Sequence, residues 1–200
     1  FLAPYYAHAE AEITINSDKT ISTAVNVSAD EDVAVRVEVQ ATNVIIDADI
    51  TSSGAKGIGL LVDSGSENNI TLNAGKTIQA LGEEGIAVLF GSNAARGTQN
   101  PGALLEIVPG KNFNVYGSLK GTKAAIYISQ YATLNNINIL SGASIEGNIT
   151  HVGSGFTNLT FGGKYSKEVT AAYNNDSADN IYEPDANFNM SYSYDITSSN

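Results

Sequence analysis

Cysteine is absent from this chain of 200 residues. In a small secreted fold, that absence removes the disulfide route to stability, so backbone hydrogen bonds and a packed interior must hold the chain together. A chain without cysteine also cannot be locked by oxidation before it crosses a further membrane. This property suits bacterial export.

Clusters of basic residues are absent as well. The chain has 21 acidic and 10 basic residues and a formal net charge of -11, and Lys and Arg gather nowhere along it. Nucleic acids and anionic membranes bind clustered cations, so neither is expected as a partner. The acidity itself is expected to keep the protein soluble.

Helical periodicity and proline are scarce. No long segment repeats apolar residues at intervals of three and four, and the chain has only 4 Pro against 19 Gly. Runs rich in Ile, Val and Thr favour β-strands over helices. With 42% hydrophobic residues, the chain can still bury a core. The composition therefore predicts an all-β fold with frequent turns.

One spacing of apolar residues and glycine recurs along the chain. It is clearest at Ile70, Leu72, Gly75 and Ile78, and copies begin at residues 13, 105 and 137, with a weaker copy at 43–50. A second kind of apolar run begins at residues 33, 57, 85 and 124, between these copies. The repeat of about 26 to 35 residues is typical of stacked units. It predicts an all-β solenoid of about five irregular stacked coils, each with two or three short strands.

Alternation within the expected strands assigns several polar and aromatic side chains to a face. Tyr127 lies between two isoleucines and should face away from them. Asn135, Asn136 and Asn138 flank strand positions, so they form either a hydrogen-bonded ladder inside the solenoid or plain solvent-facing polarity. For His151, no nucleophile elbow or orienting carboxylate is evident, which predicts a surface histidine.

Paired acidic residues are the candidates for catalysis. Asp47 and Asp49 lie two apart on an expected strand, so they would share a candidate acidic face on the outside. Glycosidase chemistry needs one acid with a raised pKa beside one ionised carboxylate, and the sequence shows no such difference. A lyase of this architecture also needs cationic groups near the carboxylates, and the two arginines of the chain have no evident place beside this pair. The other acidic pair, Glu83 and Glu84, lies in a turn flanked by glycine. The turn 30–32 lacks the shaped loop that calcium needs. No catalytic residue, metal or cofactor is therefore expected.

The longest polar interruption, residues 91–103, contains the candidate binding loop. Its polar members are Asn93, Arg96, Gln99 and Asn100. Loops on a repeat scaffold are free to vary, so binding function often resides there. The simpler alternative is a turn punctuated by proline and glycine at 101–102.

The two ends of the chain differ from the repeats. Residues 1–9 end in Ala7, His8 and Ala9 before an acidic stretch, which resembles the end of a secretory signal peptide. An N-terminal strand or cap is the alternative. The expected repeat region is 10–163. Residues 164–200 lose the glycine pattern and are expected to be a cap, a linker or a continuation toward further coils.

The repeats within 57–90 and 119–149 resemble the passenger region of bacterial autotransporters, the type V secreted proteins. The resemblance covers about residues 13–163 and carries no serine-protease signature. It implies a right-handed parallel β-helix that is exported by a signal peptide and carried through the outer membrane by a C-terminal β-barrel. The protein would then be secreted or displayed at the bacterial cell surface, associated with the outer membrane.

The expected function is a non-catalytic stalk or adhesin-like scaffold. Its expected partners are a host-surface protein or glycan, neighbouring cells, and the outer-membrane β-barrel translocator of the full-length chain. The alternative is a carbohydrate-active enzyme, a polysaccharide lyase or glycosidase on the same β-helix, that uses Asp47, Asp49 or the acidic pair at 83–84. Asn69 and Asn148 match an extended bacterial glycosylation sequon, although a chance match is favoured in so asparagine-rich a chain.

Overall fold

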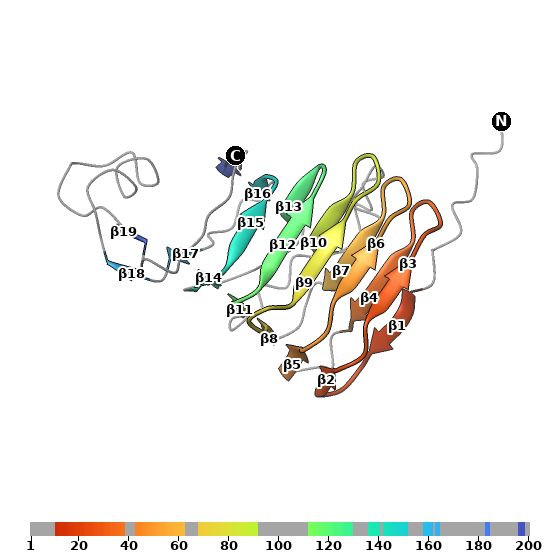
Figure 1. Cartoon of the computed structure of the whole chain (residues 1–200), viewed down its shortest axis with the longest axis horizontal. Helices are drawn as coiled ribbons and strands as arrows, with labels where there is room; N and C mark the ends of the chain where they lie inside the picture. The colour runs from red at the N-terminus through yellow and green to blue at the C-terminus, as the bar shows by residue number, and fades with distance from the viewer. Residues whose placement is uncertain are drawn as a thin grey trace, which may run out of the picture.

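A computed structural model describes residues 11–38, 43–62, 68–91, 112–129, 136–140, 142–151, 158–161, 163–164, 183–184 and 196–198. Their regular elements are all β-strands (Figure 1). No helix in this part of the chain is long and apolar enough to cross a membrane. The predicted signal-peptide remnant, residues 1–9, lies outside the described residues.

Three parallel sheets form the body of the molecule. Sheet A has seven strands, in the order β1 (Ala11–Ile15), β4 (Val33–Val37), β7 (Ile58–Val62), β10 (Ile86–Phe90), β13 (Ala124–Ile128), β16 (Ile149–His151) and β20 (Ile196–Ser198). Sheet B has six strands, β2 (Lys19–Ile21), β5 (Asn43–Ile46), β8 (Asn69–Leu72), β11 (Asn112–Val115), β14 (Asn136–Ile139) and β17 (Asn158–Phe161). Sheet C has five strands, β3 (Val25–Val27), β6 (Ile50–Ser52), β9 (Thr77–Ala80), β12 (Ser118–Gly121) and β15 (Ser144–Glu146).

The chain winds through the sheets in the order B, C, A, and then rises to the next coil. Figure 1 shows the strands of successive coils side by side along the long axis of the molecule. Four turns of this path lead from β4 to β16, slightly fewer than the five coils expected. The predicted parallel β-helix is thus confirmed. Beyond it, β18 (Gly163–Lys164) pairs antiparallel with β19 (Glu183–Pro184).

Strand register confirms the second kind of apolar run. Val33 pairs with Ile58, Ile58 with Ile86, and Ile86 with Ala124, all in sheet A. The weak copy of the opening pattern at 43–50 is confirmed too, because Val44 pairs with Ile70 in sheet B. These runs therefore mark the same position in successive coils.

Two copies of the opening pattern were assigned wrongly. The residue that pairs with Ile70 in the following coil is Phe113, and not Leu105. The pair that begins at Ile13 belongs to sheet A, where Ile13 pairs with Val35. An apolar residue, a polar residue and a second apolar residue satisfy the same local pattern in every sheet, so only the pairing of strands distinguishes them.

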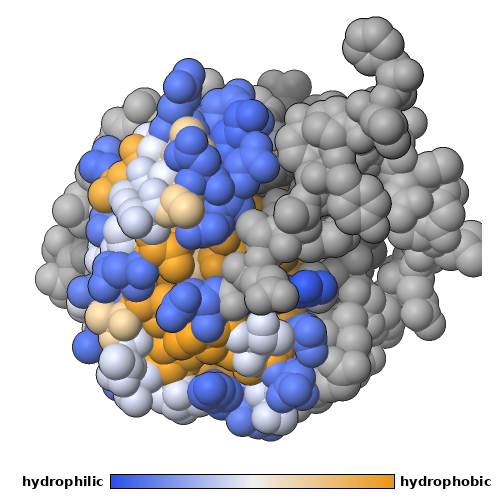
Figure 2. Space-filling model, turned by 90° about the vertical axis from the view of Figure 1, so that its right-hand side faces the viewer, coloured by the Kyte–Doolittle hydropathy of each residue, from blue (hydrophilic) through white to orange (hydrophobic). Residues whose placement is uncertain are grey.

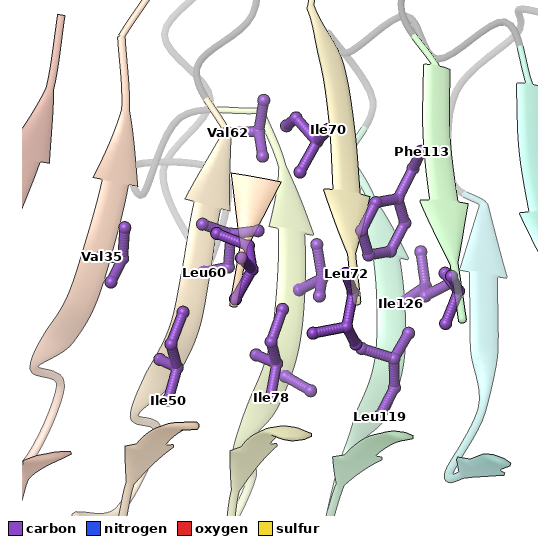
Figure 3. Packing of buried hydrophobic residues seen from close by; sticks show 14 of the residues in the cluster. Val35, Ile50, Leu60, Val62, Ile70, Leu72, Ile78, Phe113, Leu119 and Ile126 are labelled. Atoms are coloured by element: carbon purple, nitrogen blue, oxygen red, sulfur yellow. The ribbon is translucent and has the colours of Figure 1, made fainter. Parts of the chain in front are cut away.

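The interior is built from the inward-facing residues of all three sheets. Figure 3 shows Ile70 and Leu72 of sheet B, Ile78 of sheet C and Leu60 of sheet A converging on it. Each such side chain is stabilising by about 1.5–3 kcal/mol relative to an exposed one. Seen from the side of β1, β2 and β3, hydrophobic residues occupy the centre and hydrophilic ones the rim (Figure 2).

A second apolar cluster lies on the other side of sheet A. Its buried members are Val33, Ile58, Leu61, Ile86, Leu89 and Ala124. Tyr127 packs against this cluster, whereas its neighbours Ile126 and Ile128 belong to the main interior. The prediction that Tyr127 faces away from these isoleucines is confirmed.

The turns between sheets C and A stack closely. A Cβ atom on Gly82 would lie 2.0 Å from the carbonyl oxygen of Gly54 in the preceding coil. A Cβ atom cannot lie that close to a carbonyl oxygen, so glycine is required there. The same turns hold Glu31, Lys56 and Glu84 at φ values of 64°, 54° and 54°. The repetition of this left-handed conformation shows that successive turns share one backbone shape.

Candidate functional site

The acidic pair Asp47 and Asp49 lies in the corner between β5 and β6. The strands end at Ile46 and resume at Ile50, so the expectation of a strand was wrong. Both carboxylates still point outward, because Ala48 between them is buried. The pair therefore stands at an edge of the solenoid, between two sheets.

Each of these carboxylates accepts hydrogen bonds from the next coil. Asp47 Oδ1 accepts a bond of 3.1 Å from the Asn73 side-chain amide and lies 4.0 Å from Lys76 Nζ. Asp49 Oδ1 accepts a bond of 2.8 Å from the backbone N–H of Thr77. The acidic face thus serves as a set of links between coils.

Other acidic residues form similar links. Glu31 lies 3.5 Å from Lys56 Nζ, Glu84 lies 3.8 Å from Lys123 Nζ, and Glu146 lies 2.8 Å from Lys120 Nζ. Each pair joins neighbouring coils and is substantially exposed, so each contributes at most about 1 kcal/mol. Asp30, in the expected acidic turn, accepts a bond of 2.9 Å from the backbone N–H of Ala55.

No group of three or more His, Cys, Asp and Glu residues that could hold a metal ion occurs among the described residues. The candidate binding loop, with Asn93, Arg96, Gln99 and Asn100, lies outside the described residues.

A row of asparagines runs along the outside of sheet B. Asn112 Nδ2 donates to Asn69 Oδ1 at 2.8 Å, Asn136 Nδ2 donates to Asn112 Oδ1 at 2.6 Å, and Asn158 Nδ2 donates to Asn136 Oδ1 at 3.1 Å. The register aligns these residues with one another and with Asn43. They form the kind of amide ladder that stacked β-structures use.

A second row lies two residues further along the same strands. Thr71, Asn114, Asn138 and Thr160 are aligned in register. Asn138 Nδ2 donates to Asn114 Oδ1 at 2.8 Å, and Asn114 Nδ2 donates to Thr71 Oγ1 at 3.4 Å. The first of these bonds has ordinary geometry and the second is long.

The two rows together are named the amide face. Its residues are Asn69, Thr71, Asn112, Asn114, Asn136, Asn138, Asn158 and Thr160. They are partly or fully exposed, while the residues between them in β8, β11 and β14 are buried. The hydrogen-bonded asparagine ladder, one of the two interpretations of these residues, therefore exists. It faces outward, however, and not into the solenoid. Asn135 lies outside the described residues.

An aromatic side chain borders the amide face. Tyr116 follows β11 at the corner toward β12, and 42% of its surface is exposed. The backbone N–H of Tyr116 donates to the carbonyl oxygen of Leu72 in the preceding coil, so Tyr116 lies next to Asn73 of that coil. The face thus has uncharged amides and hydroxyls in its middle and an exposed ring at one edge.

His151 is placed differently from the prediction. It pairs with Ile128, an interior residue, and so occupies the inward-facing row of sheet A, where it is partly buried. Burial lowers the pKa of His151 below its ordinary value of 6.5. The expectation of a surface histidine holds only in part, because His151 takes a position in the row that Ile128 occupies in the preceding coil and is neither buried nor fully exposed there.

The two sequon asparagines lie in different environments. Asn69 is exposed and belongs to the ladder through its Oδ1 atom. Asn148 is partly buried just before β16, and its carbonyl oxygen accepts bonds from the backbone N–H groups of Ala125 and Ile126. Both asparagines thus take part in hydrogen bonds between neighbouring coils.

No protein-family model, curated protein or solved structure matches the chain.

The amide face as a whole was missed in the sequence. Asn69 and Asn112 are separated by 43 residues, whereas Asn112 and Asn136 are separated by 24. This irregular spacing hides the row. A partial signal was present in the motif of asparagine, an apolar residue, and then asparagine or threonine, which occurs at 69–71, 112–114, 136–138 and 158–160 but also at 148–150 and 187–189.

Proposed function

We propose that the chain is a non-catalytic binding scaffold, a β-solenoid that holds an outer face in a fixed shape for a partner. The observation that supports this proposal is that the candidate catalytic acids already bind groups of the neighbouring coil. Asp47 and Asp49 are both bound to the neighbouring coil through an amide, an ammonium or a backbone N–H group. A carboxylate that holds two coils together is poorly suited to also act as an acid or a base.

The scaffold role agrees with the distribution of polar links along the axis. Ion pairs and side-chain hydrogen bonds join each coil to the next on sheets B and C, as with Lys120 and Glu146 or Gln79 and Thr51. Interior packing then fixes the coils, and outward-facing residues can change without disturbing the core. This is the property expected of a stalk or adhesin-like surface.

We propose surface display as the setting of this scaffold. The repeats that resemble autotransporter passengers, the absence of cysteine and the parallel β-helix support this setting. The chain would then be secreted or held at the bacterial surface by an outer-membrane β-barrel translocator. Its partners would be a host-surface protein or glycan, or neighbouring cells.

The test separates binding from turnover. The full chain, labelled with a fluorophore, is incubated with epithelial cells and with bacterial cells, and in parallel with neutral and acidic polysaccharides. Saturable cell binding is expected, with no release of reducing ends or of unsaturated sugar products. The variant Asp47→Asn/Asp49→Asn, which keeps the acceptor oxygens, should bind cells as well as the parent.

Two results would overturn the scaffold. Polysaccharide cleavage that disappears in the Asp47→Asn/Asp49→Asn variant would establish the carbohydrate-active enzyme instead. Absence of saturable binding to every cell type, with a folded chain verified by circular dichroism, would remove the binding function.

A further inference from the structure

We infer that the amide face binds a neutral polysaccharide laid along the solenoid. This inference rests on the proposed binding function and names the chemical class of its ligand. Three features of sheet B carry it: the lack of charge on the face, the hydrogen-bonding capacity of its amides, and the exposed ring at its edge.

The amide face carries no ionisable side chain although the chain as a whole has a net charge of -11. Charged residues stand instead at the corners and turns, as Asp47 does beside Lys76. On sheet C, by contrast, the outward row includes Lys120 and Glu146. A charged ligand would find no complementary charge among the eight residues of the amide face, whereas an uncharged ligand can bind there without removing water from a charged group.

The ladder leaves hydrogen-bonding capacity unused. A side-chain amide has two N–H donors and an oxygen with two lone pairs. Asn114 uses one donor toward Thr71 and accepts one bond from Asn138. Asn136 likewise donates once and accepts once within the ladder. Each of these amides therefore keeps one donor and one acceptor site for a ligand.

Sugar hydroxyl groups match this capacity because each of them both donates and accepts hydrogen bonds. The amides repeat along the axis at the strand spacing of about 4.8 Å. A polymer with hydroxyls at regular intervals can therefore contact successive coils with the same group. An extended polysaccharide has this property, and a single small molecule does not.

Tyr116 supplies the apolar contact that sugar rings need. Sugar rings carry C–H groups on their faces, and an exposed aromatic ring packs against such surfaces while its hydroxyl stays in water. Tyr116 lies one residue after β11, which contributes Asn112 and Asn114 to the face. A chain that crosses the amides of β11 can thus reach the ring at the corner.

A protein partner fits the face less well. Protein interfaces gather aromatic and apolar residues at their centre and leave polar groups at the rim. Here the order is reversed, with amides in the middle and Tyr116 at the edge. Ile45, with 41% exposure, lies beyond the end of the amide face in β5.

The experiment titrates the full chain with soluble cello-, chito- and manno-oligosaccharides, and with oligogalacturonates as the charged comparison. Calorimetry gives the affinity, and NMR of the side-chain amides reports which asparagines are contacted. Binding of a neutral series that tightens with oligosaccharide length is expected, without binding of oligogalacturonates. The variant Tyr116→Ala should weaken it about tenfold.

Two further substitutions address the amides. Asn114→Ala should weaken binding about threefold to tenfold through loss of one hydrogen bond. Asn138→Thr replaces the amide with a hydroxyl, the group that Thr160 contributes to the same row, so it tests the amide while a polar residue stays at this position. The matched control is Gln79→Ala, which removes an outward amide that donates to Thr51 on sheet C. It should leave affinity unchanged, and circular dichroism verifies that every variant is folded.

Each contrary outcome has a distinct meaning. Cell binding without affinity for any neutral oligosaccharide would overturn the ligand class and leave the scaffold intact. Preference for oligogalacturonates, or loss of binding in Gln79→Ala alone, would overturn the assignment of this face. Absence of both cell and sugar binding would remove the proposed function as well.

Discussion

Phe113→Ala should be among the most destabilising substitutions in the chain. The side chain is fully buried, and its ring packs edge to face against Phe90, with centroids 5.6 Å apart and planes at 62°. Phe90 comes from sheet A and Phe113 from sheet B, so this contact joins two walls of the solenoid across its interior. Removal of a buried phenylalanine costs about 3–5 kcal/mol because a cavity remains.

A double-mutant cycle with Phe90→Ala isolates the ring contact. The coupling energy is expected to be about 0.5–1.5 kcal/mol, the range for edge-to-face aromatic pairs. Urea unfolding followed by circular dichroism and by tyrosine fluorescence gives the free energies. The two transitions must coincide for the energies to be compared, because stacked repeats can lose cooperativity.

The matched control is Tyr116→Ala, three positions along the chain. This aromatic ring is 42% exposed, so its removal should change the free energy of unfolding by only about 0.5 kcal/mol or less. If Phe113→Ala and Tyr116→Ala had similar effects, the assignment of one ring to the interior and the other to the surface would be refuted.

Three further predictions concern the turns, the partly buried histidine and the corner. Gly82→Ala should lower the melting temperature more than Gly75→Ala, because a Cβ atom would meet backbone at Gly82 and open space at Gly75. At Gly75 the cost is only the strain of a side chain at φ of 74°, about 1–2 kcal/mol. The reverse order would contradict close stacking of the turns. Because the pKa of His151 is lowered on folding, the free energy of unfolding should fall as the pH drops from above 6.5 through the lowered pKa. His151→Leu should reduce this slope in urea titrations, and an unchanged slope would assign it to other groups. Asp49→Ala should lower the free energy of unfolding by about 1 kcal/mol because it removes a hydrogen-bond acceptor, while Asp49→Asn should keep most of the parent's stability in the same assay. Equal losses in the two variants would show that the charge, and not the hydrogen bond, matters.

The sequence was most informative where burial leaves a strict pattern. The runs in β7 and β10 are buried on both faces, and those in β4 and β13 are buried except at Arg36 and Tyr127, because sheet A packs against the interior on one side and a second cluster on the other. Such runs stand out from the alternating strands. They therefore located the sheet A strands of four coils from sequence alone.

Corners and register were not predictable in the same way. Asp47, Ala48 and Asp49 continue the alternation of β5 without interruption, since the corner turns the chain but keeps Ala48 inward. A local pattern therefore cannot separate a corner from a strand. Leu105 and Phe113 pose the related problem, because both fit the opening pattern and only the pairing with Ile70 decides between them.

The amide face combines both difficulties and depends most on the fold. Its members are ordinary polar strand residues when taken singly, and they become an array only after coils of different length are brought into register. The same register fixes their side chains, since Asn136 is held by Asn112 on one side and by Asn158 on the other. A side chain ordered before its ligand arrives loses less conformational entropy on binding. The ladder therefore stabilises the outer wall of the solenoid and prepares that wall for recognition through the same hydrogen bonds.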